Sequence, residues 1–451
     1  MPSIYKTYDY SHIPIDEIED VDRCDLAKIA NLSVRDLCNN GNANLLIFPN
    51  CMDMIKDGVA DSCICTLNDS RLETGDLMGF VGINNCQLAI SSRFAKGDNE
   101  DFFLHYMLQK VFNINLFDLQ YTSSNDNIFD FLVYMFPYYL KKALRQGLYK
   151  QYIRKDYNDS NIKGAINVTA HIRYNTPFLG RISYRVREYA YDNHLTQLIR
   201  HTIEYIGDSC MHSVLKMDAD TETCVARIFH STPSYNKQAR SFILNKNVVP
   251  ISHPYYTEYR ILQKLCTMIL THNRLKYGTS EDKVYGLLFS GSWLWEEFLF
   301  KSLLDKCGFK HPHNRTEEDG VYLFEKPDDY SGVGARCSRC KRYPDYLKAG
   351  FILDAKYKHL DKNVIDRNDM HQVISYMYVE SAQKGGFIYP SSVDDVVIAK
   401  LGVLRGYAGI MYNIGVPIPK NQPSYKEFVK CMDETLEKLK QAKDCAGLPL
   451  W

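Results

Sequence analysis

The stretch "YPDYLKAGFILDAKYK" (residues 343–358) constrains the fold most, because it sets an apolar run between charged residues at fixed spacing. The apolar "FIL" ends at Asp354, and Lys356 follows two residues later. Residues two apart in a strand point to the same face, so these two side chains would lie together at the strand's end. Asp345 comes nine residues before Asp354. A hairpin, or a strand and a bend, could therefore bring the two acids together.

Two carboxylates at one point repel each other unless a cation lies between them. Mg²⁺ takes oxygen ligands from one or two carboxylates together with water and phosphate. A lysine beside that metal can orient or help deprotonate an attacking water and stabilise charge on phosphorus oxygens. The spacing fits either such a site or a strand that ends in solvated charges.

Two helical segments could add to this site. "WLWEEF" places Glu296 on a predicted helix before it. "HQVISYMY" places Gln372 and Tyr376 four residues apart, on one face of a predicted helix after it. Each feature alone also fits an ordinary helix surface.

The net charge of the chain gives no indication that it binds nucleic acid. The 451 residues contain 54 Lys and Arg and 54 Asp and Glu, so the formal net charge is zero. Any contact with nucleic acid must come from a local patch. Basic residues gather around the acids, and we expect them to hold a phosphate backbone unless they form a solvated loop: Arg336, Arg339, Lys341, Arg342 and Lys358.

Several classes of protein are not indicated. No phosphate-binding glycine loop is present, so we expect no nucleotide to be bound by this chain itself. No secretory signal and no run of eighteen apolar residues is visible, and the 14 cysteines show no disulfide framework. We therefore expect a cytoplasmic protein with reduced thiols and no membrane contact.

A structural zinc site is not expected. Cys337 and Cys340 form a lone C-x-x-C, which Cys307, His311 and His313 could complete. The spacing fits no standard zinc module, so free thiols in a basic loop are the favoured interpretation.

The patterning predicts a multidomain protein of α/β and α+β class. Residues 1–125 form a mixed, β-rich N-terminal domain with a hairpin at 76–94 that turns at Asn84 and Asn85. Residues 126–275 are helical with a long hairpin: helical spacing covers 127–157, and strands are predicted at 164–174 and 181–191. Residues 276–451 form an α/β domain. Its closing helix begins with a capping box of Ser424 and Glu427.

The order of these blocks resembles the PD-(D/E)xK nuclease superfamily, in particular its RecB-like branch. The resemblance is closer still to the McrC family, the nuclease subunits of McrBC restriction systems. "LWEEF", "FILDAKYK" and "DMHQVISYMY" look like McrC blocks, as do "LRQGLYKQY", "IKGAINV" and "EYAYDNHLTQLIRHTI" upstream. The similarity runs from about residue 75 to about 410. One departure is "ISSRF", where the family's I-x-P-K segment would lead us to expect a proline and, at Arg93, a lysine.

The resemblance implies a site and an assembly. Residues 276–451 would adopt the restriction-endonuclease-like fold. Asp345, Asp354 and the Ala355 carbonyl would hold Mg²⁺, which Mn²⁺ could replace. Lys356 would act on the water, Glu296 would support the metal, and Gln372 with Tyr376 would shape the site or contact DNA.

The partners implied are double-stranded DNA and a hexameric McrB-like AAA+ GTPase. Residues 1–275 would dock on the GTPase and stimulate it. Two rival functions follow from the same residues: a regulator of the GTPase that does not cleave DNA, and a stand-alone RecB-like repair nuclease.

Overall fold

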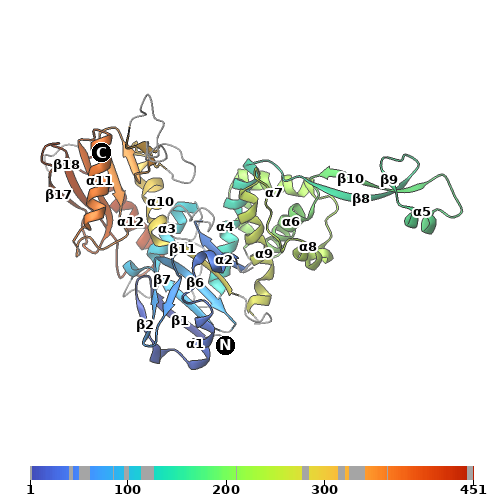
Figure 1. Ribbon diagram of the computed structural model, residues 1–451, viewed down its shortest axis with the longest axis horizontal. Helices are drawn as coiled ribbons and strands as arrows, with labels where there is room; N and C mark the ends of the chain where they lie inside the picture. The colour runs from blue at the N-terminus through green and yellow to red at the C-terminus, as the bar shows by residue number, and fades with distance from the viewer. Residues whose placement is uncertain are drawn as a thin grey trace, which may run out of the picture. The chain divides into compact units, whose positions relative to one another are not determined.

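The computed structural model describes most of the chain, with gaps. The described ranges are residues 3–39, 44–49, 61–84, 86–95, 101–112, 126–209, 211–276, 284–312, 320–324, 341–362, 364–443 and 450–451. Contacts divide the chain into two compact units (Figure 1). Met1–Tyr121 and Ser280–Trp451 form unit 1, and Thr122–Thr279 form unit 2. The molecule is a mixed α/β protein with several sheets.

The first sheet of unit 1 joins segments from both ends of the chain. Its strand order is β1-β7-β6-β11-β3. The strands are β1 (Ser3–Tyr8), β7 (Cys86–Ser91), β6 (Leu77–Ile83), β11 (Val284–Ser290) and β3 (Asn44–Phe48). β11 runs antiparallel to β6 and parallel to β3. The strand after residue 280 therefore completes a sheet that the first 91 residues begin.

The smaller elements at the N-terminus cover this sheet. A second sheet has the order β2-β5-β4, and two helices follow β2 in the chain. The elements are β2 (His12–Pro14), β5 (Arg71–Thr74), β4 (Cys65–Leu67), α1 (Asp20–Ala27) and α2 (Val34–Asn39). Leu26 and Val34 from the helices, Leu72 from β5 and Leu88 from β7 share one buried cluster. This apolar core holds the N-terminal layers together.

The other large sheet of unit 1 has the order β14-β15-β16-β18-β17. The strands are β14 (Tyr346–Lys348), β15 (Phe351–Ala355), β16 (Lys384–Ser391), β18 (Ile410–Pro417) and β17 (Val397–Val403). β15, β16 and β18 are parallel, while β14 and β17 run antiparallel at the two edges. The parallel pair β15 and β16 requires a crossover, which α11 (Arg367–Val379) provides. Val373 and Met377 of α11 pack onto this sheet.

Other helices of unit 1 also bury one apolar face. α10 (Gly291–Leu299) directly follows β11 and buries Trp295 and Phe298. It continues into a short π-helical segment, Phe300–Leu304. α3 (Phe102–Phe112) contacts α10 and also α12 (Tyr425–Lys440).

Unit 2 consists of helices and a projecting β-arm. The helices are α4 (Asp126–Arg145), α6 (His194–Gly207), α7 (Ala219–Ser231), α8 (Arg240–Lys246) and α9 (Glu258–Lys276). The arm is the antiparallel pair β8 (Gln151–Asp159) and β10 (Ile182–Ala190), with β9 (Ala165–Ile166) and α5 (Val168–Tyr174) toward its far end (Figure 1).

A long hairpin exists in this region, but only its second strand, β10, lies where it was predicted. Residues 151–157, predicted as helix, belong to β8, because the helix stops at Arg145 and Gly147 takes a φ of +90° that other residues rarely adopt. The predicted strand at 164–174 is mostly helix α5. Asn167 caps that helix by accepting a hydrogen bond from the Ala170 backbone N–H.

Other predicted elements are confirmed. β6 and β7 form the expected hairpin, with Asn84 at a φ of +50°; Asn85 lies outside the described residues. The closing helix α12 is capped by Ser424, whose side chain accepts a hydrogen bond from the Glu427 backbone N–H, which is one half of the predicted capping box. The division into three domains stays a prediction. No helix among the described residues is long and apolar enough to cross a membrane.

Candidate active site

Asp354 lies near the C-terminal end of β15, a strand inside the sheet. Phe351, Ile352 and Leu353 are all buried and anchor the strand between β14 and β16. Asp354 is itself only 2% exposed, although it is charged in water. Burial of an acid costs free energy unless a cation or hydrogen-bond donors compensate it. The strand therefore places Asp354 where a partner is required.

A hairpin brings Asp345 to the same point. β14 and β15 pair antiparallel with Tyr346 opposite Leu353, and the turn uses Gly350 at a φ of +77°. Asp345 Oδ2 accepts a hydrogen bond of 2.7 Å from the Ala355 backbone N–H. The two acids predicted to meet do meet, by the hairpin route.

Lys356 lies between two acids. Its Nζ is 2.7 Å from Asp354 Oδ2 and 3.0 Å from Asp369 Oδ1. Asp369 Oδ2 is in turn 3.1 Å from Lys358 Nζ. Asp369 belongs to the first turn of α11 and was not predicted from the sequence. Its position three residues before Gln372, on the same helix face, was the available signal.

The electrostatics of the cluster follow from this packing. Burial raises the pKa of Asp345 and of Asp354, and the charge of Asp354 raises that of Asp345 further. Burial alone would lower the pKa of Lys356, but the neighbouring acids, Asp354 first, more than offset it and the pKa is raised. The cluster therefore holds a protonated lysine beside two carboxyls. The pKa values of both carboxyls stay raised, because the charge of Lys356 does not fully offset the effect of their burial.

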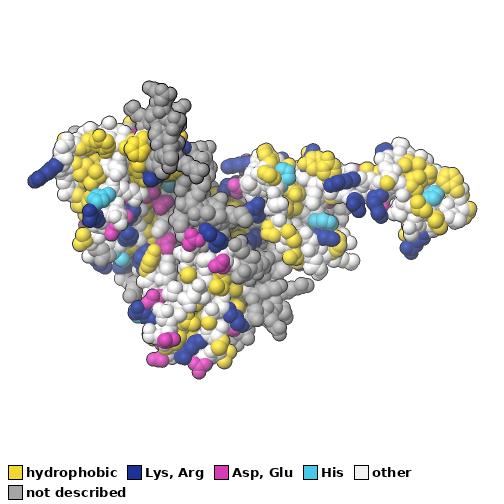
Figure 2. Space-filling model, in the orientation of Figure 1, with side chains coloured by type: hydrophobic (Ala, Val, Ile, Leu, Met, Phe, Trp, Pro, Cys, Tyr) yellow, Lys and Arg dark blue, Asp and Glu magenta, His cyan; other side chains and the backbone are white. Residues whose placement is uncertain are grey.

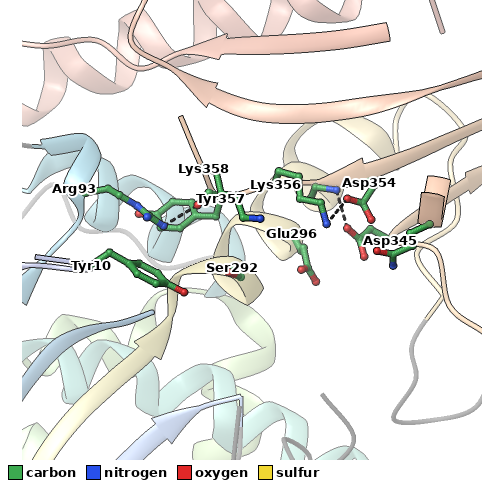
Figure 3. Close-up of a pocket in the computed structure, with 11 residues that line it drawn as sticks. Tyr10, Arg93, Ser292, Glu296, Asp345, Asp354, Lys356, Tyr357 and Lys358 are labelled. Atoms are coloured by element: carbon green, nitrogen blue, oxygen red, sulfur yellow. Dashed lines mark hydrogen bonds and ion pairs between the residues drawn. The ribbon is translucent and has the colours of Figure 1, made fainter. Parts of the chain in front are cut away.

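A pocket of about 400 Å³ opens over this cluster (Figure 3). The predicted residues in its lining are Glu296, Asp345, Asp354, Ala355, Lys356, Lys358 and Gln372. The other lining residues were not predicted as site residues: Tyr10, Arg93, Ser292 and Tyr357. Figure 3 shows the acids and Lys356 at one side of the pocket and the group of Tyr10, Arg93 and Tyr357 at the other.

The helix residues take different places. Glu296 lies on α10 in the pocket wall, and its backbone carbonyl accepts a hydrogen bond from the Tyr346 hydroxyl at 2.8 Å. Gln372 is exposed to the pocket and donates from Nε2 to the Tyr376 hydroxyl at 3.2 Å. Tyr376 is buried, so it orients Gln372.

Only some of the residues predicted to contact DNA lie in the described ranges. Arg336 and Arg339 lie outside the described residues, as do Cys337, Cys340 and His313. Lys341 and Arg342 form β13 (Lys341–Arg342), which pairs with β12 (Val321–Tyr322). Burial raises the pKa of Tyr376, and the charge of Arg342 opposes this rise slightly.

The donor set decides which metal the residues fit. Within the described ranges no group of three or more His, Cys, Asp or Glu side chains is placed to hold a metal ion. Two carboxylates that share one point suit Mg²⁺, which keeps several waters, better than a structural zinc, which is held by four protein ligands, mostly Cys and His. Cys307 is a free thiol, and His311 Nδ1 lies 2.6 Å from the Asp345 carbonyl oxygen.

Comparison with known proteins identifies a family that matches this chain. The family model of the "McrBC 5-methylcytosine restriction system component" matches residues 72–390, well over half of the chain. No curated protein matches the sequence.

Two solved assemblies from Thermococcus gammatolerans are similar to the chain. One is a refined half-complex of McrB AAA+ hexamers with bound McrC, at 14% identity and a TM-score of 0.48, covering 97% of this chain and 100% of that chain. The other is a cryo-EM structure of the McrBC complex, at 14% identity and a TM-score of 0.33, covering 66% of this chain and 86% of that chain. On the strength of the family model, the predicted family is confirmed: the chain belongs to the McrBC 5-methylcytosine restriction system components.

Proposed function

We propose that the chain is the Mg²⁺-dependent DNA endonuclease subunit of a GTP-dependent, McrBC-like restriction complex, with a PD-(D/E)xK nuclease domain. The observation that carries the proposal is the convergence of Asp345, Asp354 and Lys356 in one pocket at the edge of a mixed sheet. Family membership supports the same assignment.

The residues take the following roles in this proposal. Asp345 and Asp354, with the Ala355 carbonyl, would hold Mg²⁺, and the metal would polarise the scissile phosphate and a bound water. Lys356 is an ammonium group in its ion pairs, so it would donate hydrogen bonds to the water or to a phosphate oxygen. Glu296 would support the metal, and Gln372, hydrogen-bonded to Tyr376, would shape the site or contact the DNA backbone.

Lys358, Lys341 and Arg342 would contribute the salt-dependent contacts to phosphate. Such contacts fix the position of DNA and carry no sequence information. The sequence or modification that the complex recognises would therefore come from outside these residues.

We assign partner docking to residues 1–275, with the arm of unit 2 as the leading surface. Large apolar side chains are exposed on the outer part of the arm, and Figure 2 shows them beside Lys and Arg side chains. They are Ile162, Ile166, Val168, Ile172, Tyr174, Phe178 and Leu179. A contiguous exposed apolar patch marks a protein interaction site. An AAA+ GTPase hexamer of the McrB kind is the partner we propose.

Cleavage of plasmid DNA tests the function. Wild type, Asp354→Ala and the exposed-site control Asp395→Asn are compared with and without Mg²⁺, and with and without the partner GTPase and GTP. We expect cleavage by wild type and the control only when metal, partner and GTP are all present. Asp354→Ala should not cleave but should still stimulate the GTPase.

The rival functions give different results in the same assay. Stimulation of the GTPase without cleavage under any condition would establish a regulator. Cleavage that needs neither partner nor GTP would establish a stand-alone nuclease.

A further inference from the structure

We propose that Arg93 is a positioning residue that ties the N-terminal sheet of unit 1 to the strand end that carries Asp354 and Lys356. The inference rests on the proposed function for its catalytic consequence. Its structural basis is independent of that function, because it lies in contacts between residues 9–94 and Tyr357.

The first contact is a hydrogen bond to the backbone just beyond the lysine. Arg93 Nη2 donates to the Tyr357 carbonyl oxygen at 2.7 Å (Figure 3). On the preceding residue, the Lys356 backbone N–H donates to the Ile388 carbonyl at 2.9 Å. The peptide segment that follows β15 is therefore held by β16 at Lys356 and by the N-terminal domain at Tyr357.

The guanidinium of Arg93 is itself fixed from three sides. Its Nε lies 3.0 Å from Oδ2 of the fully buried Asp9. Its Cζ lies 4.5 Å from the ring centroid of Tyr10 and 4.8 Å from that of Tyr357. A planar group with several donors can make the ion pair, the ring contacts and the carbonyl hydrogen bond at once, which an ammonium group cannot.

The Tyr357 side chain is anchored to the same segment. Its hydroxyl lies 2.7 Å from Ser92 Oγ, and its ring contacts Phe94 edge-on with centroids 4.9 Å apart. On its other side, a Cβ built on Gly291 would lie 2.6 Å from the Tyr357 ring. Tyr357 therefore fills the space between residues 92–94 and the start of α10.

A second contact holds the helix that carries Glu296. Asp76, just before β6, accepts hydrogen bonds from Ser290 Oγ at 2.6 Å and from Ser292 Oγ at 3.0 Å. These residues cap and open α10. The N-terminal domain thus contacts both elements that form the pocket: the strand through Arg93 and the helix through Asp76.

The consequence is a geometric one. Lys356 is adjacent to Tyr357, so movement of the Tyr357 carbonyl would rotate the backbone from which Lys356 extends. A displacement of about 1 Å in a catalytic group can lower a rate by about 100-fold. Loss of the Arg93 contact should therefore reduce turnover without weakening DNA binding.

The test compares Arg93→Met, Arg93→Lys and the control Arg71→Met, which removes an exposed, ion-paired arginine from the same domain. In the plasmid assay with partner and GTP, we expect Arg93→Met to lower kcat by about 10- to 100-fold with KM for DNA unchanged. Arg93→Lys should recover part of that loss, and Arg71→Met should match wild type. Stimulation of the GTPase should be the same in all four proteins.

Hydrogen exchange supplies a readout that needs no cleavage. In Arg93→Met we expect the amides of residues 355–358 to exchange about tenfold faster, while those of β6 and β7 keep their protection. If wild type does not cleave DNA, the proposed function fails, and this exchange result still decides the positioning role.

Three outcomes would overturn the inference. A rise in KM with kcat retained would make Arg93 a DNA contact. Faster exchange across the whole N-terminal sheet, with GTPase stimulation lost, would make it a folding residue; a lower Tm alone is expected, because Arg93→Met leaves the buried Asp9 without its cation. Unchanged exchange at residues 355–358 would remove any positioning role.

Discussion

Asp369 shows how much a single unpredicted residue shapes the candidate site. Lys356 donates to Asp369 as well as to Asp354, so its ammonium group has two fixed directions. Burial would raise the pKa of Asp369, but the ion pairs with Lys356 and Lys358 outweigh it and the pKa is lowered. Asp369 is therefore an anion that restrains the lysine from the helix side.

Replacement of that anion should affect turnover more than folding. We expect Asp369→Asn to lower kcat for DNA cleavage by about tenfold, because Lys356 loses one of its two restraints. Asp369→Glu should restore part of the activity. The measurement is single-turnover cleavage beside Asp395→Asn. Equal losses in Asp369→Asn and Asp369→Glu, together with a lower Tm in both, would show that the residue acts on stability instead.

A buried histidine in unit 2 predicts a pH dependence of stability. His201 is fully buried, and neither ring nitrogen has a hydrogen-bond partner among the described residues. Burial, with smaller contributions from Arg240 and Arg200, lowers its pKa to about 4. In the unfolded chain the pKa is about 6.5. Between about pH 4 and pH 6.5, His201 is therefore protonated in the unfolded state and neutral in the folded state.

The free energy of unfolding should therefore fall as the pH falls from about 6.5 to about 4, by roughly 1–3 kcal/mol after screening by solvent. Other groups titrate in the same window, so the test is the difference between wild type and His201→Phe. Chemical denaturation at pH 7.5, 5.5 and 4.5 should show His201→Phe gaining on wild type as the pH drops. A difference that stays constant with pH would contradict the assignment.

At the scale of elements, the arm of unit 2 illustrates the limit of periodicity. "QYIRKDYND" alternates and forms β8, but it follows the helical "YYLKKALR" so closely that one helical pattern covers both. The break lies at Gly147, whose left-handed conformation a sequence pattern does not reveal. The strand that pairs with β10 was therefore assigned to the wrong segment, and only β10 itself was predicted.

The outer part of the arm should matter for the partner and not for folding. Phe178 and Leu179 are 62% and 83% exposed. We expect Phe178→Ser combined with Leu179→Ser to lower stimulation of the partner GTPase by about tenfold or more, since two exposed apolar contacts are removed. Tm should stay within about 1 °C of wild type. Full stimulation by the variant would move the docking surface away from the arm.

The strand that carries Asp354, with Lys356 just beyond its end, was predictable for a physical reason. An apolar "FIL" has to be buried, and the residue that ends it has to lie at the sheet edge, so Asp354 and Lys356 followed from the local pattern. Arg93, Tyr10 and Asp76 contact the site from more than 200 residues away in the sequence. Local patterning carries no information on such pairings, and these residues were therefore missed.

At the scale of the molecule, the two halves of unit 1 depend on each other. β11 lies between β6 and β3 and shares hydrogen bonds with both. Residues 1–125 alone would leave β3 without its only neighbour in the described sheet. Residues 276–451 alone would expose the buried strand β11. The predicted domain borders at 125 and 276 therefore make poor places to cut unit 1.

Fragment expression checks this dependence. We expect residues 126–276 to give a soluble fragment with a cooperative thermal transition, because α9 packs against both α4 and α6 within unit 2. Residues 1–125 and 276–451 should each aggregate or unfold non-cooperatively when expressed singly. Co-expression of these two fragments should yield a complex. Cooperative folding of either fragment alone would show that β11 is dispensable to the sheet.

The placement of β11 also sets an order of events on the ribosome. β6 and β11 are about 200 residues apart, and synthesis at about 5–20 residues per second would separate them by roughly 10–40 seconds. Throughout that interval the nascent chain carries β6 with one open hydrogen-bonding edge and β3 with no strand beside it. Unpaired edges of this kind attract other chains. The emerging polypeptide therefore passes through a long interval in which chaperone protection decides its yield, until a single late strand closes the sheet.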